Sequence, residues 1–304
     1  MRKRRKRDRI SSRSWLSHLW HEWSVESWRA IAPALAHPRP HEWPNDRLTV
    51  TWLGHSTVLL NFFGVIILTD PVLFPRIGIR VPYLFTIGPK RLTKPALTWR
   101  DLPPIDLILL SHAHFDHIDT RTLHRFRAPT QVVTAPRTRD LLRWTKLREI
   151  TELKSGETHQ VETARGSVTV RAFRVNHWGA RLQYDSYRGY NGYVLERDGR
   201  RVIFSGDTAL TNGFASLNDG QPYDLALMGI GAYEPWIRSH CTPEQAIAMA
   251  DAASARFILP MHHQTFKLSF EPFCEPIERF VEALADEPER IALREIGETF
   301  VLED

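Results

Sequence analysis

Four side chains of the kinds that bind metal ions lie within six residues of one another: His112, His114, Asp116 and His117. They follow directly on Ser111 and the apolar run 107–110, which predicts a buried strand. Two histidines spaced two apart can both reach one ion, and the aspartate and histidine after the turn can reach a second point nearby. Imidazole and carboxylate ligands suit zinc, iron or manganese and need no thiolate. A polar loop of hydrogen-bonded histidines is the alternative, but so dense a cluster after an apolar strand favours a metal site.

Metal-binding side chains also follow other apolar runs. His177, Asp207, His240 and His262 each come after a predicted strand. The ends of several strands can meet at one edge of a sheet, so these four side chains can converge with the 112–117 cluster. A carboxylate such as that of Asp207 has two oxygens and can bridge two ions. A single histidine after a strand is more often a polar cap, so the prediction depends on the whole set.

Short strands open the predicted body, which begins at Leu48. His55 and Asp70 come where two of these strands end, and each could line the site or be structural. The segment 74–104 shows no clear period and predicts a long loop, whose apolar side chains could cradle an apolar substrate or pack on the body. The expected helices are 120–126, 136–144, 243–253 and 276–285. The expected strands are 48–53, 57–61, 65–69, 107–110, 131–134, 150–153, 159–161, 167–175, 193–196, 201–204, 224–230, 256–260 and 292–295.

The N-terminal part differs from the body in composition. Residues 1–9 hold seven Lys or Arg and one Asp, a local charge of +6, and since the whole chain carries +5 the remainder is close to −1. A nucleic-acid-binding protein more often carries a basic face on its folded domain, so we do not expect a nucleic-acid partner. Residues 12–35 contain four tryptophans and predict an amphipathic helix, which could contact an anionic membrane peripherally or pack on the body. We therefore expect a segment 1–47, ending in a proline-rich linker, and one domain, 48–304.

The two cysteines give no sign of a metal site or a disulfide framework. Cys241 and Cys274 stand far apart and form no CxxC pair. No secretory signal or apolar span is visible in the sequence. We therefore expect a cytoplasmic protein that could contact the membrane peripherally through residues 1–35.

The run His112-Ala-His-Phe-Asp-His117 resembles the His-x-His-x-Asp-His signature of the metallo-β-lactamase superfamily. Within that superfamily the chain is most similar to the N-acylphosphatidylethanolamine phospholipase D group and its bacterial relatives. The stretches that carry this likeness are Trp52-Leu-Gly-His-Ser56, Thr69-Asp-Pro71, His112 to Asp119, His177-Trp178, Gly206-Asp-Thr208, Ile230-Gly-Ala-Tyr-Glu-Pro235 and His240-x-x-Pro243-Glu244.

The resemblance implies an α/β fold, a four-layer αβ/βα sandwich with two mixed sheets and flanking helices, and a metal site at one sheet edge. It implies two divalent metal ions, with Zn²⁺ expected first and Mn²⁺ or Fe as alternatives. His263 follows His262 where relatives usually have tryptophan, so either histidine could bind, and the alignment favours His262. The implied ligands are His112, His114 and His177 for one ion, Asp116, His117 and His262 for the other, and Asp207 as a bridge.

The same resemblance implies a phosphodiesterase of phospholipase D type that attacks N-acylphosphatidylethanolamine-like phospholipids with a hydroxide activated by two ions. Asp116 and His240 would be catalytic, with His240 polarising a phosphate oxygen or protonating the leaving group. Asp119 could orient a ligand histidine, and His55, Tyr233 and His240 could contact substrate. A hydrolase of sugar-phosphate or other lactones is one alternative, because that group shares the early Gly-His and Asp-Pro elements. A metal-stabilised binding protein without catalysis is the alternative from another class.

Overall fold

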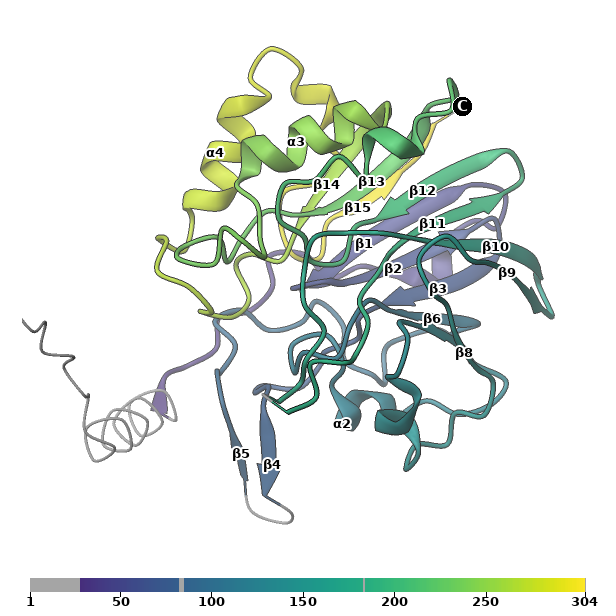
Figure 1. Cartoon of the computed structure of the whole chain (residues 1–304), viewed down its shortest axis with the longest axis vertical. Coiled ribbons are helices and arrows are strands. Elements are labelled where there is room, and N and C mark those ends of the chain that lie inside the picture. The colour runs from purple at the N-terminus through teal and green to yellow at the C-terminus, as the bar shows by residue number, and fades with distance from the viewer. Residues whose placement is uncertain (1–27, 82–84, 183, 304) are drawn as a thin grey trace, which may run out of the picture.

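The computed structural model describes residues 28–81, 85–182 and 184–303, and in this part of the chain two mixed β-sheets face each other (Figure 1). The first sheet has the order β15-β1-β2-β3-β6-β7-β8. Its pairs from β15 to β3 are antiparallel and those from β3 to β8 are parallel. The strands are β1 Leu48–Gly54, β2 Thr57–Phe62, β3 Val65–Thr69, β6 Leu107–Leu110, β7 Gln131–Thr134, β8 Ile150–Glu152 and β15 Thr299–Val301.

The second sheet has the order β14-β13-β12-β11-β10-β9. It is parallel from β14 to β12 and antiparallel from β12 to β9. A separate two-stranded hairpin, β4 with β5, stands apart from both sheets. The strands are β9 Thr158–Thr163, β10 Gly166–Phe173, β11 Gly192–Arg197, β12 Arg200–Phe204, β13 Tyr223–Gly229 and β14 Ala255–Met261, and those of the hairpin are β4 Ile79–Val81 and β5 Phe85–Ile87.

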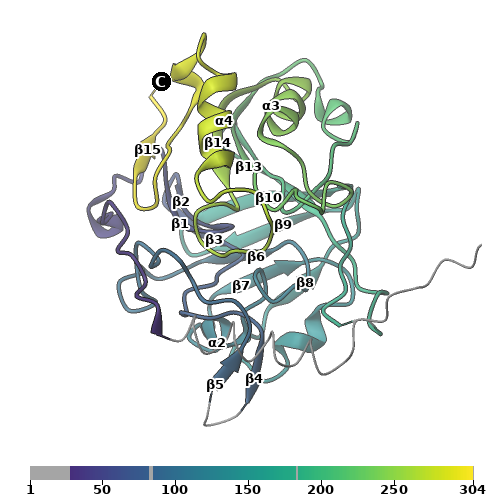
Figure 2. The same cartoon turned by 90° about the vertical axis from the view of Figure 1, so that its left-hand side faces the viewer.

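Helices lie outside the two sheets (Figure 2). Helices α3 and α4 pack on each other, and α3 packs on β13 and β14, while α2 and η2 lie together beside the first sheet. Thr242 caps α3 through a capping box with Gln245, and Pro243 opens its first turn, as the sequence predicts. The four-layer αβ/βα sandwich expected from the sequence is confirmed. The helices are α2 Thr120–Leu123, α3 Pro243–Ala252 and α4 Glu275–Ala283, with 3₁₀ helices η1 Pro40–Glu42, η2 Arg139–Leu142, η3 Ala215–Leu217 and η4 Pro288–Arg290.

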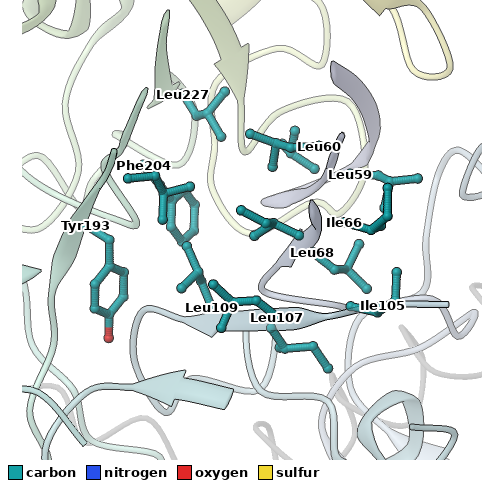
Figure 3. Packing of buried hydrophobic residues seen from close by; sticks show 14 of the residues in the cluster. Leu59, Leu60, Ile66, Leu68, Ile105, Leu107, Leu109, Tyr193, Phe204 and Leu227 are labelled. Carbon is teal, nitrogen blue, oxygen red and sulfur yellow. The ribbon is translucent and has the colours of Figure 1, made fainter. Parts of the chain in front are cut away.

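The main hydrophobic core lies between the two sheets (Figure 3). Successive side chains of a strand point to opposite faces, so one strand serves two layers. On β12, Phe204 joins the core between the sheets and Ile203 joins the cluster under the helices; on β13, Leu227 and Met228 divide in the same way. Both faces of this sheet are therefore apolar and buried. This explains why the sequences of these strands are continuous apolar runs and do not alternate with polar residues.

One edge of the sandwich collects the strand ends that carry the polar side chains. The pairings make β1, β3 and β6 run in one direction in the first sheet, and β10, β12, β13 and β14 run in one direction in the second. Their carboxyl ends therefore lie on common edges, where crevices between connecting loops form binding sites. Gly206 lets the two sheets approach here: its φ is +58° and a Cβ there would stand 2.8 Å from that of Ser111.

Several predicted elements are shorter or displaced. The helix expected at 136–144 is only the 3₁₀ turn η2, whose first backbone N–H groups donate to the Glu152 carboxylate. The prediction of a strand at 292–295 is wrong. The Glu298 carboxylate accepts hydrogen bonds from the N–H groups of residues 294 and 295 and holds a turn there. The final strand is β15 instead. The loop expected at 74–104 contains the β4–β5 hairpin, and part of it packs on the body, as Ile77 does.

The N-terminal prediction lies mostly outside the described residues, since residues 1–27 are not among them. The helix expected through residue 35 is not continued: Ile31 to Leu35 is not helical and runs along the body, where Ala32 accepts from the N–H of Lys94 and donates to Leu92. Within the described ranges no helix is both long enough and apolar enough to cross a membrane. The domain boundary at 47/48 stays a prediction.

Candidate metal centre

Three imidazoles from two sheets meet at the common edge. His112 and His114 follow β6, and His177 follows β10. The nitrogen atoms that face one another are His112 Nε2, His114 Nδ1 and His177 Nε2, separated by 2.8, 3.2 and 3.3 Å. A tetrahedral zinc ion with bonds of about 2.0–2.1 Å keeps its ligand atoms roughly 3.4 Å apart, so these spacings are close to those of a metal site.

Hydrogen bonding alone does not satisfy this triangle. Each of the three facing nitrogens either carries a hydrogen or presents a lone pair. At least two of the three must therefore be in the same state, and those two cannot form a hydrogen bond with each other. The Nδ1 of His177 lies 2.8 Å from the carbonyl of Ser239, to which it can only donate. Its Nε2 therefore presents a lone pair to the other rings. Lone pairs that converge in this way favour a cation between them.

A second set of ligand atoms adjoins the first. The carboxylate Oδ2 of Asp116 lies 3.5 Å from His117 Nε2, 3.5 Å from His262 Nε2 and 2.9 Å from His55 Nε2. These four side chains form one candidate metal-binding group, and the three histidines with Asp207 form another. His263 is in neither group, because its ring packs on Trp52 with 4.5 Å between ring centroids. The structure thus brings His262 rather than His263 into the cluster.

The carboxylate of Asp207 stands between the two sets. It follows β12 and is 3 % exposed. One oxygen, Oδ2, lies among imidazoles from both sets, while Oδ1 is buried with no hydrogen-bond partner. Asp207 can therefore reach both sets of ligands at once. The distances from Oδ2 are 3.0 Å to His117 Nε2, 3.2 Å to His262 Nε2, 3.8 Å to His112 Nε2, 3.9 Å to His177 Nε2 and 3.9 Å to His240 Nδ1.

Charge separates the histidines of the cluster into two kinds. Burial and the neighbouring histidines hold the pKa of His112 well below its usual value and lower the pKa of His114 to about 4. Burial also opposes the charged form of His262, but the carboxylates of Asp207 and Asp116 outweigh it and raise the pKa of His262 to about 9. The pKa of His117 is raised well above its usual value for the same reasons. The two carboxylates thus favour the protonated, positively charged forms of His117 and His262 in a buried site. A bound cation would supply this positive charge in place of the two protons.

The unpartnered atoms test whether the residues fit a metal. Among the described residues, few buried side-chain nitrogens or oxygens lack a hydrogen bond, and most of those that do lie in or beside this cluster. Buried polar groups are almost always paired, so unpaired atoms that face one another need an explanation. A divalent cation supplies it, because imidazole lone pairs and carboxylate oxygens are its ligands. The unpaired atoms that face the cluster are His117 Nε2 and His262 Nε2, which converge on Asp207, and Asp207 Oδ1 itself.

Asp70, at the end of β3, orients one ligand histidine of each set. Its Oδ2 accepts from His117 Nδ1 at 2.6 Å and from Ser111 Oγ at 2.5 Å. Ser111 Oγ in turn lies 2.9 Å from His112 Nδ1 and, having given its hydrogen to Asp70, accepts one there. Both rings therefore keep the tautomer that presents Nε2 to the cluster. The sequence marked Asp70 only as a strand-end residue.

The orienting role expected of Asp119 is not what the structure shows. The Asp119 carboxylate caps α2, accepting from the N–H of Arg121 at 3.3 Å and from Thr122 Oγ1 at 2.7 Å. Its side chain ends a local turn, because an aspartate at this position satisfies the free N–H groups of the following helix. Asp70 reaches the ligands instead, since β3 and β6 are neighbours in the sheet.

Replacing Asp70 with asparagine is expected to weaken metal binding by about 10–100-fold, because the neutral amide cannot accept from all three groups that the carboxylate holds. Metal affinity measured by competition with a chelating dye tests this. Asp119→Asn is the matched control, a nearby buried carboxylate that caps a helix, and it should cost stability of about 1 kcal/mol with metal affinity retained. A larger affinity loss in Asp119→Asn than in Asp70→Asn would reverse the assignment.

Arg181 holds the metal-binding loop in place, and no sequence pattern predicts this role. Its Nη1 donates to the carbonyls of Ala113 and Ile118, each at 2.9 Å, and its guanidinium lies 4.0 Å from the ring centroid of Phe115. One side chain thus ties both ends of the loop together. Only the tertiary contact reveals this, because Arg181 lies in an irregular segment far along the chain.

Of the three residues predicted to contact substrate, two lie in the metal-binding cluster and one lies outside it. His55 is fully part of the cluster, through Asp116, and His240 stands between His177 and His262 with 5.2 Å between ring centroids in each case. Burial lowers the pKa of His240 to about 3. Tyr233 instead donates its hydroxyl to Glu275 at 2.9 Å. Its substrate-binding role stays a prediction that this contact does not support.

A family model described as a β-lactamase superfamily domain matches residues 66–263, well over half of the chain. The chain belongs to the metallo-β-lactamase superfamily. With its cluster of metal-ligating side chains, this places the chain among metal-dependent hydrolases of the metallo-β-lactamase fold.

Relatives within the superfamily include phospholipases. An uncharacterized protein of Mycobacterium tuberculosis is 32% identical over 277 residues, which are 87% of this chain and 71% of the relative. N-acyl-phosphatidylethanolamine-hydrolyzing phospholipase D 1 of Caenorhabditis elegans is 31% identical over 252 residues, 78% of this chain and 70% of the worm protein. The mitochondrial N-acyl-phosphatidylethanolamine-hydrolyzing phospholipase D of Saccharomyces cerevisiae is 31% identical over 247 residues, 78% of this chain and 51% of the yeast protein. This metallo-β-lactamase superfamily member is thus similar to the N-acylphosphatidylethanolamine phospholipase D group.

Solved structures agree on the fold. A metallo hydrolase from Ignicoccus hospitalis superposes with a TM-score of 0.63 at 21% identity, covering 84% of this chain and 99% of that one. A possible metal-dependent hydrolase from Veillonella parvula gives 0.65 at 16% identity, covering 84% and 100%. At such identities the likeness supports the metallo-β-lactamase fold and nothing finer.

Proposed function

We propose that the chain is a phosphodiesterase of phospholipase D type that hydrolyses N-acylphosphatidylethanolamine-like phospholipids. It uses two divalent ions, of which Zn²⁺ is the first expectation. The observation that carries the proposal is that two sets of ligand atoms share one oxygen of Asp207, as a two-ion site requires. The worm and yeast relatives, each 31% identical, support the substrate class.

Two ions held by these residues would lower the pKa of water towards about 7 and neutralise the phosphate oxygens. Asp116 would fix the second ligand set, because its Oδ2 contacts His117, His262 and His55 together. Asp70 and Ser239 would keep the imidazoles in the tautomers that bind metal. Most of the catalytic contribution of the chain would thus be orientation of charges before the substrate arrives.

His240 is the side chain best placed to contact a bound phosphate. Its Nδ1 lies 3.9 Å from Asp207 Oδ2, and 14% of its side chain is exposed. With a pKa of about 3 it is neutral at physiological pH. A neutral imidazole can donate a hydrogen bond to a non-bridging oxygen, whereas protonating the leaving group would need an imidazolium. The proposal therefore gives His240 the first of its two predicted roles.

Replacing His240 with alanine is expected to lower kcat about 100-fold or more, because one donor to the developing charge is lost. His240→Gln keeps an N–H donor and should lose less. Bound metal, measured by elemental analysis, should be the same in both variants as in the unmodified chain. Loss of metal in His240→Ala would make His240 a ligand rather than a substrate contact.

The deciding experiment gives the metal-loaded protein vesicles that contain N-acylphosphatidylethanolamine. Phosphatidic acid and N-acylethanolamine, identified by mass spectrometry, are the expected products of water attacking phosphorus. Turnover of soluble lactones without these products would favour the lactone hydrolase. No turnover of any phosphodiester or ester by the metal-loaded chain would favour the non-catalytic binding protein.

Peripheral membrane contact through residues 1–35 is part of this proposal and rests on their basic and tryptophan-rich sequence. Deleting residues 1–27 is expected to weaken sedimentation with anionic vesicles, while activity on a soluble phosphodiester is retained. Unchanged sedimentation would remove this segment from the membrane contact.

A further inference from the structure

The β4–β5 hairpin turns an apolar face outward. In its register Ile79 lies opposite Ile87, and Arg80 lies opposite Thr86. Paired residues share a face, so the two isoleucines lie on one side of the ribbon and Thr86 on the other. Ile79 is 53% exposed and Ile87 44% exposed, whereas Thr86 is buried. A free two-stranded ribbon normally buries its apolar side, so this arrangement needs an explanation.

The body holds the hairpin by its polar face. Arg121 on α2 donates from Nη1 to Thr86 Oγ1 at 2.9 Å, and from Nη2 to the carbonyl of Arg76 at the start of the loop. The apolar face is therefore directed away from the body by a specific contact. In Figures 1 and 2 the hairpin and α2 lie together at the lower end of the molecule, on the side away from β15.

Cations gather on α2, which contacts the hairpin through Arg121, and on the segment that packs on α2. Between Thr120 and Arg148 the sequence has eight Lys or Arg and a single acidic residue, Asp140, which pairs with Arg188. Helix α2 packs on η2, and the turn after α2 forms a β-bridge with the segment after η2, from Arg127 to Lys146. Trp144 in this region is 75% exposed. The basic rim consists of the exposed cations of this region, which are Arg125, Arg127, Arg137, Arg139, Arg143, Lys146 and Arg148.

The hairpin is also connected to the metal centre. Ile77, just before β4, is buried with Val72 and Phe266, and Phe115 packs against this cluster. Phe115 stands between His114 and Asp116 in the metal-binding loop. A surface that receives the hairpin would therefore lie close to the metal-binding loop.

We propose that the β4–β5 hairpin and the basic rim form a docking face for a lipid bilayer with anionic head groups. Isoleucines on the outward face of a ribbon can enter the head-group region, and arginine, lysine and tryptophan are the side chains that lie at such an interface. A second copy of this chain fits less well, because it would bring two basic rims together. The proposal builds on the proposed phospholipid substrate and adds the face through which the chain reaches it.

Sedimentation with vesicles tests the docking face without any turnover. The full-length, metal-loaded chain is mixed with vesicles of phosphatidylcholine and phosphatidylglycerol, or of phosphatidylcholine alone. The double variant Ile79→Thr/Ile87→Thr keeps β-branched residues in the hairpin and should bind at least about tenfold more weakly. Val301→Thr on β15, an exposed valine at the other end of the molecule, is the matched control and should bind as the unmodified chain does. All variants carry the same N-terminal tail, so its contribution cancels.

The rim is tested by Arg143→Gln/Lys146→Gln, which should weaken binding to the anionic vesicles about fivefold per charge at low salt and have no effect at high salt. Activity of every variant on a soluble phosphodiester should match that of the unmodified chain. Equal vesicle binding by the isoleucine variant would overturn the proposal. The proposal would also be overturned if the unmodified chain formed a dimer in analytical ultracentrifugation and the isoleucine variant did not, while both bound vesicles equally. The face would then join two copies of the chain. Vesicle binding without phospholipid hydrolysis would overturn the proposed function and leave the docking face intact.

Discussion

Replacing Asp207 with alanine is expected to abolish turnover, by more than about 1000-fold, and to lower the metal content of the purified protein. The Oδ2 atom of Asp207 lies within 3.9 Å of nitrogens from both ligand sets, so its loss removes the anion on which both sets converge. Its charge also helps to raise the pKa of His117 and His262. Without it, imidazoles of two sets would face one another with no anion between them.

Asp224→Ala is the matched control for this variant. Asp224 is another buried carboxylate of the same sheet, at the opposite end of β13, where it accepts from the N–H of Arg201 at 2.8 Å. Its loss should lower stability by about 1–3 kcal/mol and leave metal content unchanged, because it leaves a buried N–H unpaired far from the cluster. Elemental analysis, kcat and thermal unfolding of the two variants separate the two roles. Full activity in Asp207→Ala would contradict the assignment of Asp207 as the shared ligand.

Removal of metal by a chelator is expected to stop turnover and to lower Tm by several degrees, since a metal at 1,000 times its Kd adds about 4 kcal/mol to the native state. Added zinc should restore both. The cluster connects strands of both sheets, so loss of the ion should loosen the whole edge rather than one loop. A chelated protein with unchanged Tm and activity would show that these residues form no metal centre.

The pH dependence of stability should reverse when metal is removed. In the metal-free protein the pKa of His262 is raised from 6.5 to about 9, so its contribution to stability is complete below pH 6.5 and is lost as pH rises to about 9. A metal ion binds the deprotonated ring, so the metal-bound protein should gain stability over the same window as protons cease to compete. The histidines with lowered pKa, such as His240 with a pKa of about 3, affect stability only below pH 6.5. Thermal unfolding from pH 6.5 to 9 with and without zinc measures both slopes.

The sequence by itself determined which side chains could bind metal and where the strands that carry them end. Spacing in the run from His112 to His117 is local information, and an apolar run followed by a polar ligand marks a strand end without any knowledge of its neighbours. The same pattern placed His177, Asp207 and His262 at strand ends, and the family likeness then gave the fold. Even the choice between His262 and His263 could be made by alignment.

Only the tertiary structure decided what surrounds these ligands. Asp70 rather than Asp119 orients His117, because strand pairing brings the end of β3 beside that of β6 while Asp119 caps its own helix. Arg181 holds the metal-binding loop from an irregular segment that no period predicts. The direction in which Ile79 and Ile87 point depends on one contact of Thr86 with Arg121. Each of these depends on a long-range contact, and such contacts leave no local period in the sequence, because only folding brings their partners together.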